Sequence, residues 1–270
     1  MTKLEIIRPD KKPRGIRAAV FDFDGTVSTL RCGWEQVMRP LMLEVISGKK
    51  AEDAPEELQK EVDAYIDAST GIQTIYQMQW LRDRAHRAGF GSPEKDEWWY
   101  KGDYNRRLME FIGDRIKSVE SGAVAPETYI MKGSVEFLTA LKNAGVEVYL
   151  ASGTDHKDVV HEATALGVRD LFTQIKGAPE HMAACSKEAV IRMIIEEKGL
   201  HGDELLLCGD GKVEIRLGAE AGAVTLGAAT DEVHRAGINP VKRRRLIDAG
   251  ADAITGDFEN YAEIMKYLGF

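Results

Sequence analysis

Two aspartates stand one residue apart at the end of an apolar run, in the stretch "AAVFDFDGT" (18–26). Alternate residues of a strand point to the same face, so Asp22 and Asp24 can meet one ligand. Removing a carboxylate from water is unfavourable unless it is paired with a cation or bound to a metal. Two interpretations stay open from this stretch alone. Either Asp24 caps a helix and Asp22 begins a turn, or the two carboxylates form a site.

A second acidic stretch, "LLLCGDGKVE" (205–214), runs from another apolar segment into Asp210 and places Glu214 four residues later. Two parallel strands that end in acids bring three or four carboxylates to one edge of a sheet, where like charges repel. A divalent cation removes that repulsion, and oxygen ligands without His or Cys indicate Mg²⁺, which also binds substrate phosphate. Taken alone, Asp210 followed by Gly211 is more typical of an ordinary turn than of a site.

Three further positions fit a phosphoryl group. Ser152 and Gly153 end the apolar run "VEVYLASG" (146–153), where a hydroxyl and backbone N–H groups suit phosphoryl oxygens. Lys187 begins a helical pattern, and its ammonium would neutralise a phosphoryl group and Asp22 together. Lys176 competes with it for this role. The alternatives are a turn-forming serine and a surface lysine.

Short apolar runs, each ending in small or polar residues, predict the strands that position these side chains. Helical periodicity separates the later runs, which predicts an α/β fold: a Rossmann-like parallel sheet with helices on both faces. Ligands of such sheets bind beyond the carboxyl ends of the strands. The expected strands are Ile16–Asp24, Val146–Gly153, Asp170–Gly177, Glu204–Asp210, Ala223–Ala229 and Ala251–Phe258.

Residues 29–124 contain almost no strand signal and four helical patterns. A helical block between the first and second strands predicts an inserted all-helical cap domain over 29–124, with a catalytic core formed by 1–28 and 125–270. The expected helices of the insert are Trp34–Ile46, Pro55–Ile66, Thr74–Arg87 and Lys95–Val119.

Composition limits the class of protein. The 270 residues are 44% hydrophobic and 30% charged, as expected for a globular chain with one large domain or a core plus a smaller domain. A net charge of −8 argues against nucleic acid and anionic membranes as partners, and the basic run Lys242–Arg245 is interpreted as a solvated helix face.

Without a signal peptide or a long apolar run, we expect a cytoplasmic protein. Cys32, Cys185 and Cys208 are interpreted as reduced thiols, with Cys208 buried in a strand.

In their order and spacing, "DFDGT" (22–26), Ser152, a lysine before the fourth strand and "GDGKVE" (209–214) resemble the haloacid dehalogenase superfamily. The resemblance covers roughly 16–28 and 125–258, and the helical insert looks like the family's C1-type cap. The first motif is highly specific, the last moderately so, and the middle two are weak singly. Many relatives carry Asp where this chain has Glu214, which makes that ligand the least secure of the acids.

The resemblance implies a role for each acid. Asp22 would attack phosphorus and form an aspartyl-phosphate, and Asp24 would protonate the leaving alcohol and then deprotonate water. Mg²⁺ would be held by Asp22, the backbone carbonyl of Asp24, and Asp210, with Glu214 bound directly or through water. Ser152 and Lys187 would hold the phosphoryl oxygens. An acid at position 24 fits an oxygen leaving group, because dehalogenases and phosphonate-cleaving members lack it.

The insert is expected to close over the site and set specificity. Arg31 and Trp34 follow the first motif and would line the entrance, Arg31 on an anionic or polyhydroxy group and Trp34 on a sugar face. Thr70, Gln73 and Gln77 offer neutral hydrogen bonds suited to hydroxyls. The alternative for these helical-domain residues is packing within the cap.

Three functions follow in order of preference. The first is a Mg²⁺-dependent phosphatase that hydrolyses a small phosphorylated metabolite, such as a sugar or polyol phosphate, through an aspartyl-phosphate. The second is a phosphomutase of the β-phosphoglucomutase type, which returns the phosphoryl group to a sugar. The third is a non-catalytic phosphosugar-binding domain, against which the acid set argues because a binding module has no use for Asp24.

Overall fold

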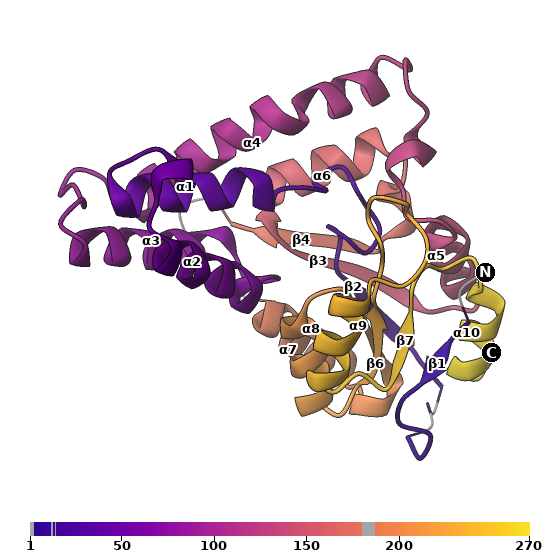
Figure 1. The fold of residues 1–270 in the computed structure, drawn as a ribbon. Coiled ribbons are helices and arrows are strands. Elements are labelled where there is room, and N and C mark those ends of the chain that lie inside the picture. Colours follow the sequence, from indigo (N-terminus) through magenta and orange to yellow (C-terminus); the bar gives the residue numbers. More distant parts are fainter. Residues whose placement is uncertain (1–2, 12, 14, 180–186) are drawn as a thin grey trace. The chain divides into compact units, whose positions relative to one another are not determined.

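The computed structural model describes residues 3–11, 13, 15–179 and 187–270. Across these residues one sheet forms, with the strand order β1-β7-β6-β5-β2-β3-β4 (Figure 1). The strands are β1(Glu5–Ile6), β2(Ala18–Phe21), β3(Glu147–Asp155), β4(Gln174–Ala178), β5(Leu205–Gly209), β6(Val224–Ala228) and β7(Ala253–Thr255).

Strands β2 to β7 are parallel, and β1 pairs antiparallel with β7. The first parallel strand, β2, lies at the centre between β3 and β5, so the direction of strand succession reverses at β2. In open α/β sheets the crevice at such a reversal point binds ligands. We therefore expect a site at the carboxyl ends of β2, β3 and β5.

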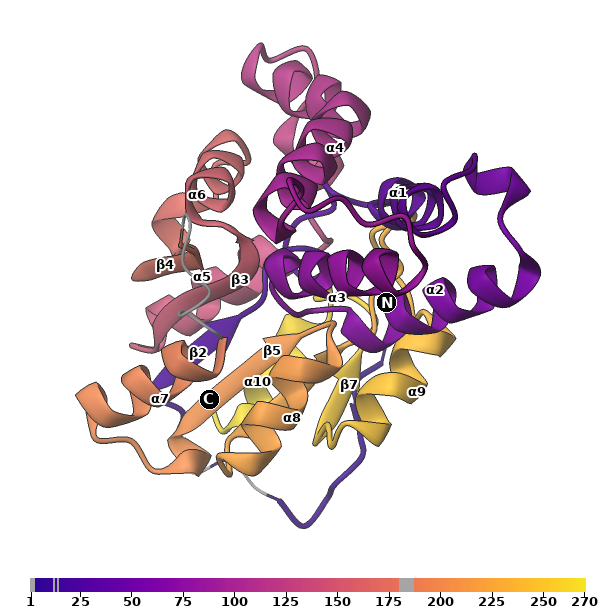
Figure 2. The same cartoon turned by 90° about the vertical axis from the view of Figure 1, so that its left-hand side faces the viewer.

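Helices cover both faces of the sheet. On one face lie α7 and α8 (Figure 2). There Val20 of β2 and Leu207 of β5 belong to one buried cluster with Val190, Ile191 and Ile194 of α7, and Leu217 of α8 packs against it. The other face carries a buried aromatic group. The ring of Phe137 of α5 meets the ring of Phe21 of β2 edge-on, with the ring centroids 5.7 Å apart, and it stacks on the ring of Phe258, with the centroids 5.5 Å apart. The helices of this unit are α5(Ser134–Asn143), α6(His156–Ala165), α7(Lys187–Lys198), α8(Lys212–Glu220), α9(Pro240–Asp248) and α10(Tyr261–Leu268), with the short η2(Pro126–Tyr129), η3(Arg169–Leu171) and η4(Gly202–Glu204).

The chain divides into two compact units, Gly33–Lys117 and the remainder formed by Met1–Cys32 and Ser118–Phe270. The first of these is helical throughout. Within it, the rings of Tyr65 and Trp80 stack with their centroids 3.8 Å apart. Arg84 and Glu61 form an ion pair with an N–O distance of 2.7 Å. The helices of this region are α1(Glu35–Ser47), η1(Ala51–Asp53), α2(Glu56–Ser69), α3(Thr74–Arg87) and α4(Glu97–Glu120), the last of which extends three residues beyond Lys117.

The expected fold class is confirmed, with a parallel sheet covered on both faces and a helical insert after the first parallel strand. The sequence prediction missed β1, because two residues are too few to show alternation. Cys208 is buried in β5 as expected, whereas Cys185 lies outside the described residues. Within the described ranges, no helix combines the length and apolar character needed to cross a bilayer.

Candidate active site

The first acidic motif is a tight turn at the end of β2. The Asp22 N–H donates to the Cys208 carbonyl at 2.9 Å, which continues the β2–β5 ladder up to the aspartate. The chain then turns at Gly25, whose φ of +75° lies in the left-handed region. A Cβ at this glycine would also collide with the Asp210 carboxylate. Gly25 thus permits both the turn and the close approach of the second acidic loop.

The acids of the two motifs meet. Asp22, Asp210 and Glu214 are buried, and each offers a carboxylate oxygen within 4.8 Å of the others. Burial raises the pKa of Asp22 well above its ordinary value, Lys187 opposes that rise, and Glu214, Asp210 and Asp24 add to it. The structure therefore supports the interpretation of these stretches as a site over their interpretation as unrelated turns.

Lys187 belongs to this cluster. Its Nζ lies 3.0 Å from Asp22 Oδ1 and 3.1 Å from Glu214 Oε2. Burial alone would lower the pKa of this ammonium, but Asp22 and Glu214 outweigh burial and raise it. The lysine is therefore a charged partner of the acids. Lys176, the other candidate, lies in β4 beside Ala151 of β3.

Glu214 is held at the beginning of α8. Its Oε1 accepts a hydrogen bond from the Gly211 N–H at 2.6 Å, so this carboxylate caps its own helix while its other oxygen meets Lys187. A Cβ at Gly209 or at Gly211 would collide with the Glu214 side chain. The two glycines of "GDG" therefore make room for the longer acid, whose direct or water-mediated binding of a metal stays a prediction.

Asp24 is bound to the end of β3. The Thr154 hydroxyl donates to Asp24 Oδ2 at 2.8 Å, and the Ser152 hydroxyl lies 3.5 Å from the same oxygen. Ser152 in turn accepts the Thr154 N–H at 3.0 Å. Ser152 is thus brought to the site, next to the second aspartate. Gly153 lies between the two hydroxyl residues, where the β3–β4 register shifts. Sequence reasoning missed Thr154, although it lies two residues beyond Ser152 on the same strand.

Arg31 lies in the unit that contains the sheet, where its guanidinium forms an ion pair. Its guanidinium makes a bidentate contact with Glu162 of α6, with Nη2 at 2.6 Å and Nε at 3.0 Å from Oε1. Asp158 and Asp24 lie further away, at 3.8 and 3.9 Å. Burial raises the pKa of Glu162 although Arg31 opposes that rise. The substrate role of Arg31 stays a prediction, and the structure gives it an ion-pair partner that the sequence did not reveal.

The solvated-face interpretation of Lys242–Arg245 is wrong for Lys242. Its side chain is only 12% exposed, and it is ion-paired with Asp210 and Glu232. Because these partners lie 32 and 10 residues away in the chain, the pattern of a basic run did not reveal them.

The remaining predicted substrate residues lie in the helical unit. Trp34 precedes the first residue of α1, and Gln73 precedes the first residue of α3. The Thr70 hydroxyl donates to the Ile66 carbonyl at 3.0 Å, and the Gln77 amide donates to the Ser69 hydroxyl at 3.1 Å. Thr70 and Gln77 therefore stabilise the unit's own helices, and substrate contact stays a prediction for all four.

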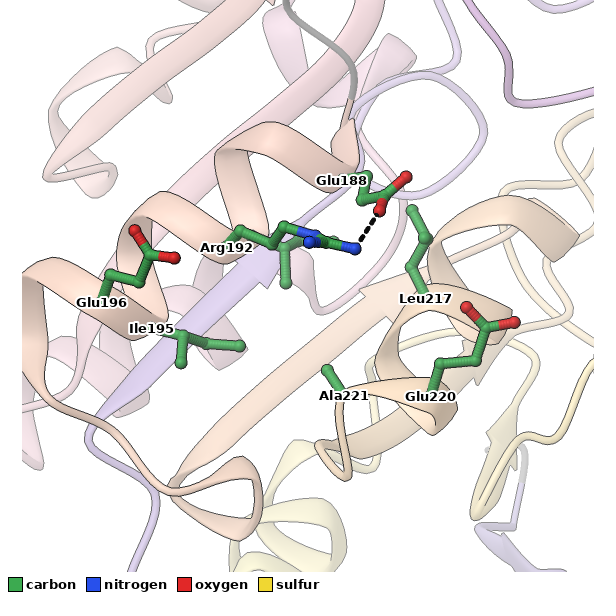
Figure 3. Close-up of a pocket in the computed structure, with 8 residues that line it drawn as sticks. Glu188, Arg192, Ile195, Glu196, Leu217, Glu220 and Ala221 are labelled. Atoms are coloured by element: carbon green, nitrogen blue, oxygen red, sulfur yellow. Dashed lines mark hydrogen bonds and ion pairs between the residues drawn. The ribbon is translucent and has the colours of Figure 1, made fainter.

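A pocket of about 270 Å³ lies elsewhere on the core unit, between α7 and α8 (Figure 3). Glu188 of α7 is ion-paired with Arg192 there at 2.6 Å, and the apolar lining includes Ile195 of α7 and Leu217 of α8. None of the clustered acids lines this pocket, so it is distinct from the candidate active site.

The residues of the acid cluster fit a magnesium ion. The three buried carboxylates supply only oxygen ligands, which hard divalent cations prefer. The neighbouring Cys208 is a poor competitor for a soft metal, because burial raises the pKa of its thiol and keeps it protonated. An ion of charge +2 would also offset the excess of acids over the Lys187 ammonium, since Lys242, which contacts Asp210, is also paired with Glu232.

Solved structures share this fold at low sequence identity. A structure described as a predicted phosphoglycolate phosphatase from Haemophilus somnus is 19% identical with a TM-score of 0.61, covering 93% of this chain and 98% of its own. A β-phosphoglucomutase from Clostridium difficile is 14% identical with a TM-score of 0.63, covering 94% and 97%. A predicted phosphatase from Clostridium acetobutylicum is 16% identical with a TM-score of 0.62, covering 94% and 100%. These likenesses establish the fold.

Comparison with curated protein sequences gave no match. A sequence model of the haloacid dehalogenase-like hydrolases, in contrast, matches residues 16–222. That range includes both acidic motifs, β3 and Lys187. The chain therefore belongs to the haloacid dehalogenase-like hydrolase family.

Proposed function

We propose that the protein is a Mg²⁺-dependent phosphatase that hydrolyses a small phosphorylated metabolite, such as a sugar or polyol phosphate. The observation that carries the proposal is the convergence of Asp22, Asp210 and Glu214 on one buried point at the carboxyl ends of β2 and β5. Membership of the hydrolase family agrees with it.

In this proposal Asp22 is the nucleophile. One carboxylate oxygen forms a bond to phosphorus while the bond from phosphorus to the alcohol oxygen breaks, which gives an aspartyl-phosphate. Lys187, 3.0 Å from Asp22, favours the ionised carboxylate and would balance charge on the phosphoryl oxygens. Ser152 would donate its hydroxyl to a phosphoryl oxygen.

Asp24 is the general acid and base. It gives its proton to the departing alcohol oxygen, and its carboxylate then takes a proton from the water that attacks the aspartyl-phosphate. The Thr154 hydroxyl, which donates to Asp24 Oδ2, would hold this side chain in one orientation between the two steps. Such a role has no counterpart in a pure binding domain.

Asp22, Asp210, Glu214 and the backbone carbonyl of Asp24 would hold the magnesium ion. When bound, Mg²⁺ supplies charge stabilisation for the transferring phosphoryl group. The protein itself contributes buried carboxylate oxygens, held at fixed positions, as ligands.

A phosphomutase is the second candidate, favoured by the likeness to the β-phosphoglucomutase structure. The same residues would form the aspartyl-phosphate, which would then return its phosphoryl group to a different hydroxyl of a sugar. The two functions differ in the acceptor, which is water for the phosphatase and sugar for the mutase.

The test is incubation of the purified protein with a panel of sugar and polyol phosphates, after EDTA treatment and again after Mg²⁺ addition. We expect inorganic phosphate to appear only with Mg²⁺. Positional isomerisation without phosphate release would assign the mutase instead. Full activity after rigorous metal removal, or no turnover of any phosphate ester with Mg²⁺, would refute the proposal.

A further inference from the structure

Lys242 of α9 is a second buried lysine at the acid cluster. Its Nζ lies 2.6 Å from Asp210 Oδ2 and 2.6 Å from Glu232 Oε1, and the Thr230 hydroxyl is 3.4 Å away. Lys242 therefore contacts Asp210, whereas Lys187 contacts the other two acids of the cluster, Asp22 and Glu214.

The same face of α9 holds the backbone of Asp210. The guanidinium of Arg245, three residues after Lys242, donates to the Asp210 carbonyl at 3.2 Å. Residues three apart share one face of a helix, so α9 binds this aspartate through both its carboxylate and its main chain. The side chain of Asn239 accepts the Val241 and Lys242 N–H groups and fixes where the helix begins.

The segment before α9 is tied to the first motif. Thr230 follows β6, and its hydroxyl donates to the carbonyl of Gly25. Gly25 in turn lies so close to Asp210 and Glu232 that a Cβ there would meet both side chains. Residues 230–245 thus contact both acidic loops, and Lys242 is their charged contact with Asp210.

The charge of Lys242 is already balanced. Glu232 is 17% exposed in its side chain and lies as close to the ammonium as Asp210 does. The pair carries no net charge, so Glu232 offsets part of the repulsion that the ammonium would exert on a cation at the cluster. If the ammonium were removed, Asp210 and Glu232 would be left as two neighbouring carboxylates that repel one another.

We propose that Lys242 is a positioning residue of the metal site: its ammonium, held by Glu232, fixes the Asp210 carboxylate in the orientation that binds magnesium. The inference rests on the proposed function only for the identity of the metal. Partners of metal ligands commonly contribute 10- to 100-fold to metal affinity.

The test compares Mg²⁺ binding to metal-free wild type, Lys242→Met and Arg244→Met by isothermal titration calorimetry without substrate. Met keeps the length and apolar stem of lysine but lacks its charge and donors. Arg244 is exposed on the same helix, so Arg244→Met removes the same charge without touching Asp210. Circular dichroism and thermal unfolding of the metal-free proteins check that each variant is folded.

We expect Lys242→Met to bind Mg²⁺ about 10-fold more weakly or worse, and Arg244→Met to bind it within about 2-fold of wild type. Lys242→Gln, which keeps an N–H donor, is expected to lie between wild type and Lys242→Met, and it replaces the Met variant if that does not fold. Unchanged or tighter binding by the folded Lys242 variants would overturn the proposal, since a lysine that merely opposes the cation predicts tighter binding.

Phosphate release in the same preparations separates the two proposals. Wild type that binds Mg²⁺ but hydrolyses no phosphate ester would defeat the proposed function. The role of Lys242 would still be tested by the Mg²⁺ affinities of wild type and the variants. Active wild type with unaltered Mg²⁺ binding in the Lys242 variants would defeat the positioning role alone. Wild type that binds no Mg²⁺ would defeat both.

Discussion

At the scale of single residues, the two aspartates of the first motif have different surroundings. Asp22 is buried among Lys187, Asp210 and Glu214, whereas Asp24 is 26% exposed in its side chain and is held by the hydroxyl of Thr154. A buried carboxylate beside a lysine suits attack on phosphorus. A more accessible carboxylate suits proton exchange with an alcohol and with water.

Replacement of Asp24 by Asn is therefore expected to lower the rate of phosphoryl transfer by about 10²- to 10⁴-fold for an alkyl phosphate, the range in which general acids contribute. The loss should be smaller for an aryl phosphate, because a phenolate leaves without a proton. Single-turnover rates for the two esters measure this difference. Equal losses for both would contradict the assignment of Asp24 as the general acid.

The convergence of Asp22, Asp210 and Glu214 was predictable from sequence, because each of the two motifs follows an apolar run and contains a glycine at its turn. Thr154, Glu162 and Lys242 were not. Their partners Asp24, Arg31 and Asp210 lie 130, 131 and 32 residues away in the chain, so only the folded structure shows which charged group each side chain meets. Within the helical unit, hydrogen bonds such as that from Gln77 to Ser69 could not be separated from substrate contacts by residue type alone.

At the scale of elements, the packing of α5 supports the strand that carries Asp22. Phe137 of α5 lies between Phe21 of β2 and Phe258. Gly133 precedes the helix with a φ of +77°, and a Cβ there would overlap the backbone of Phe258. Gly145 follows the other end of the helix with a φ of +82°, and a Cβ added to it would meet no atom within 4 Å.

The two glycines make a matched pair. Gly145→Ala is expected to lower the free energy of unfolding by about 1 kcal/mol, from left-handed backbone strain alone. Gly133→Ala has the same strain and also a steric overlap with the Phe258 backbone. It is expected to lower the free energy of unfolding by about 1–3 kcal/mol more than Gly145→Ala does. Denaturant unfolding of both variants measures the difference. Equal stabilities would show that the close approach at Gly133 contributes nothing.

Element types were predictable because long apolar or periodic stretches dominate them. All six expected strands formed. The ends of the strands differ from the expected ones. The strand expected over Ile16–Asp24 is β2(Ala18–Phe21), and both aspartates therefore lie beyond its end. The ends depend on turn hydrogen bonds, such as those to the Phe23 carbonyl, that periodicity does not encode.

At the scale of the whole molecule, the site exists only in the complete parallel sheet. Asp22 and Asp210 are far apart in sequence, and they meet because β2 and β5 are hydrogen-bonded neighbours in register. Strand order, rather than any local motif, makes the two loops adjacent. The apolar runs and helical periodicity predicted a parallel sheet with acids at the ends of two strands, but not the strand order that makes those strands neighbours.

The most direct test of this account is the hydrolysis of an aryl phosphate by Mg²⁺-loaded wild type and Asp22→Asn. Asn nearly preserves the shape of the side chain but cannot form a stable acyl phosphate, so we expect the rate to fall by at least about 1000-fold while thermal unfolding shows a folded protein. A folded Asp22→Asn protein that keeps a rate within a few-fold of wild type would contradict the nucleophilic role of Asp22.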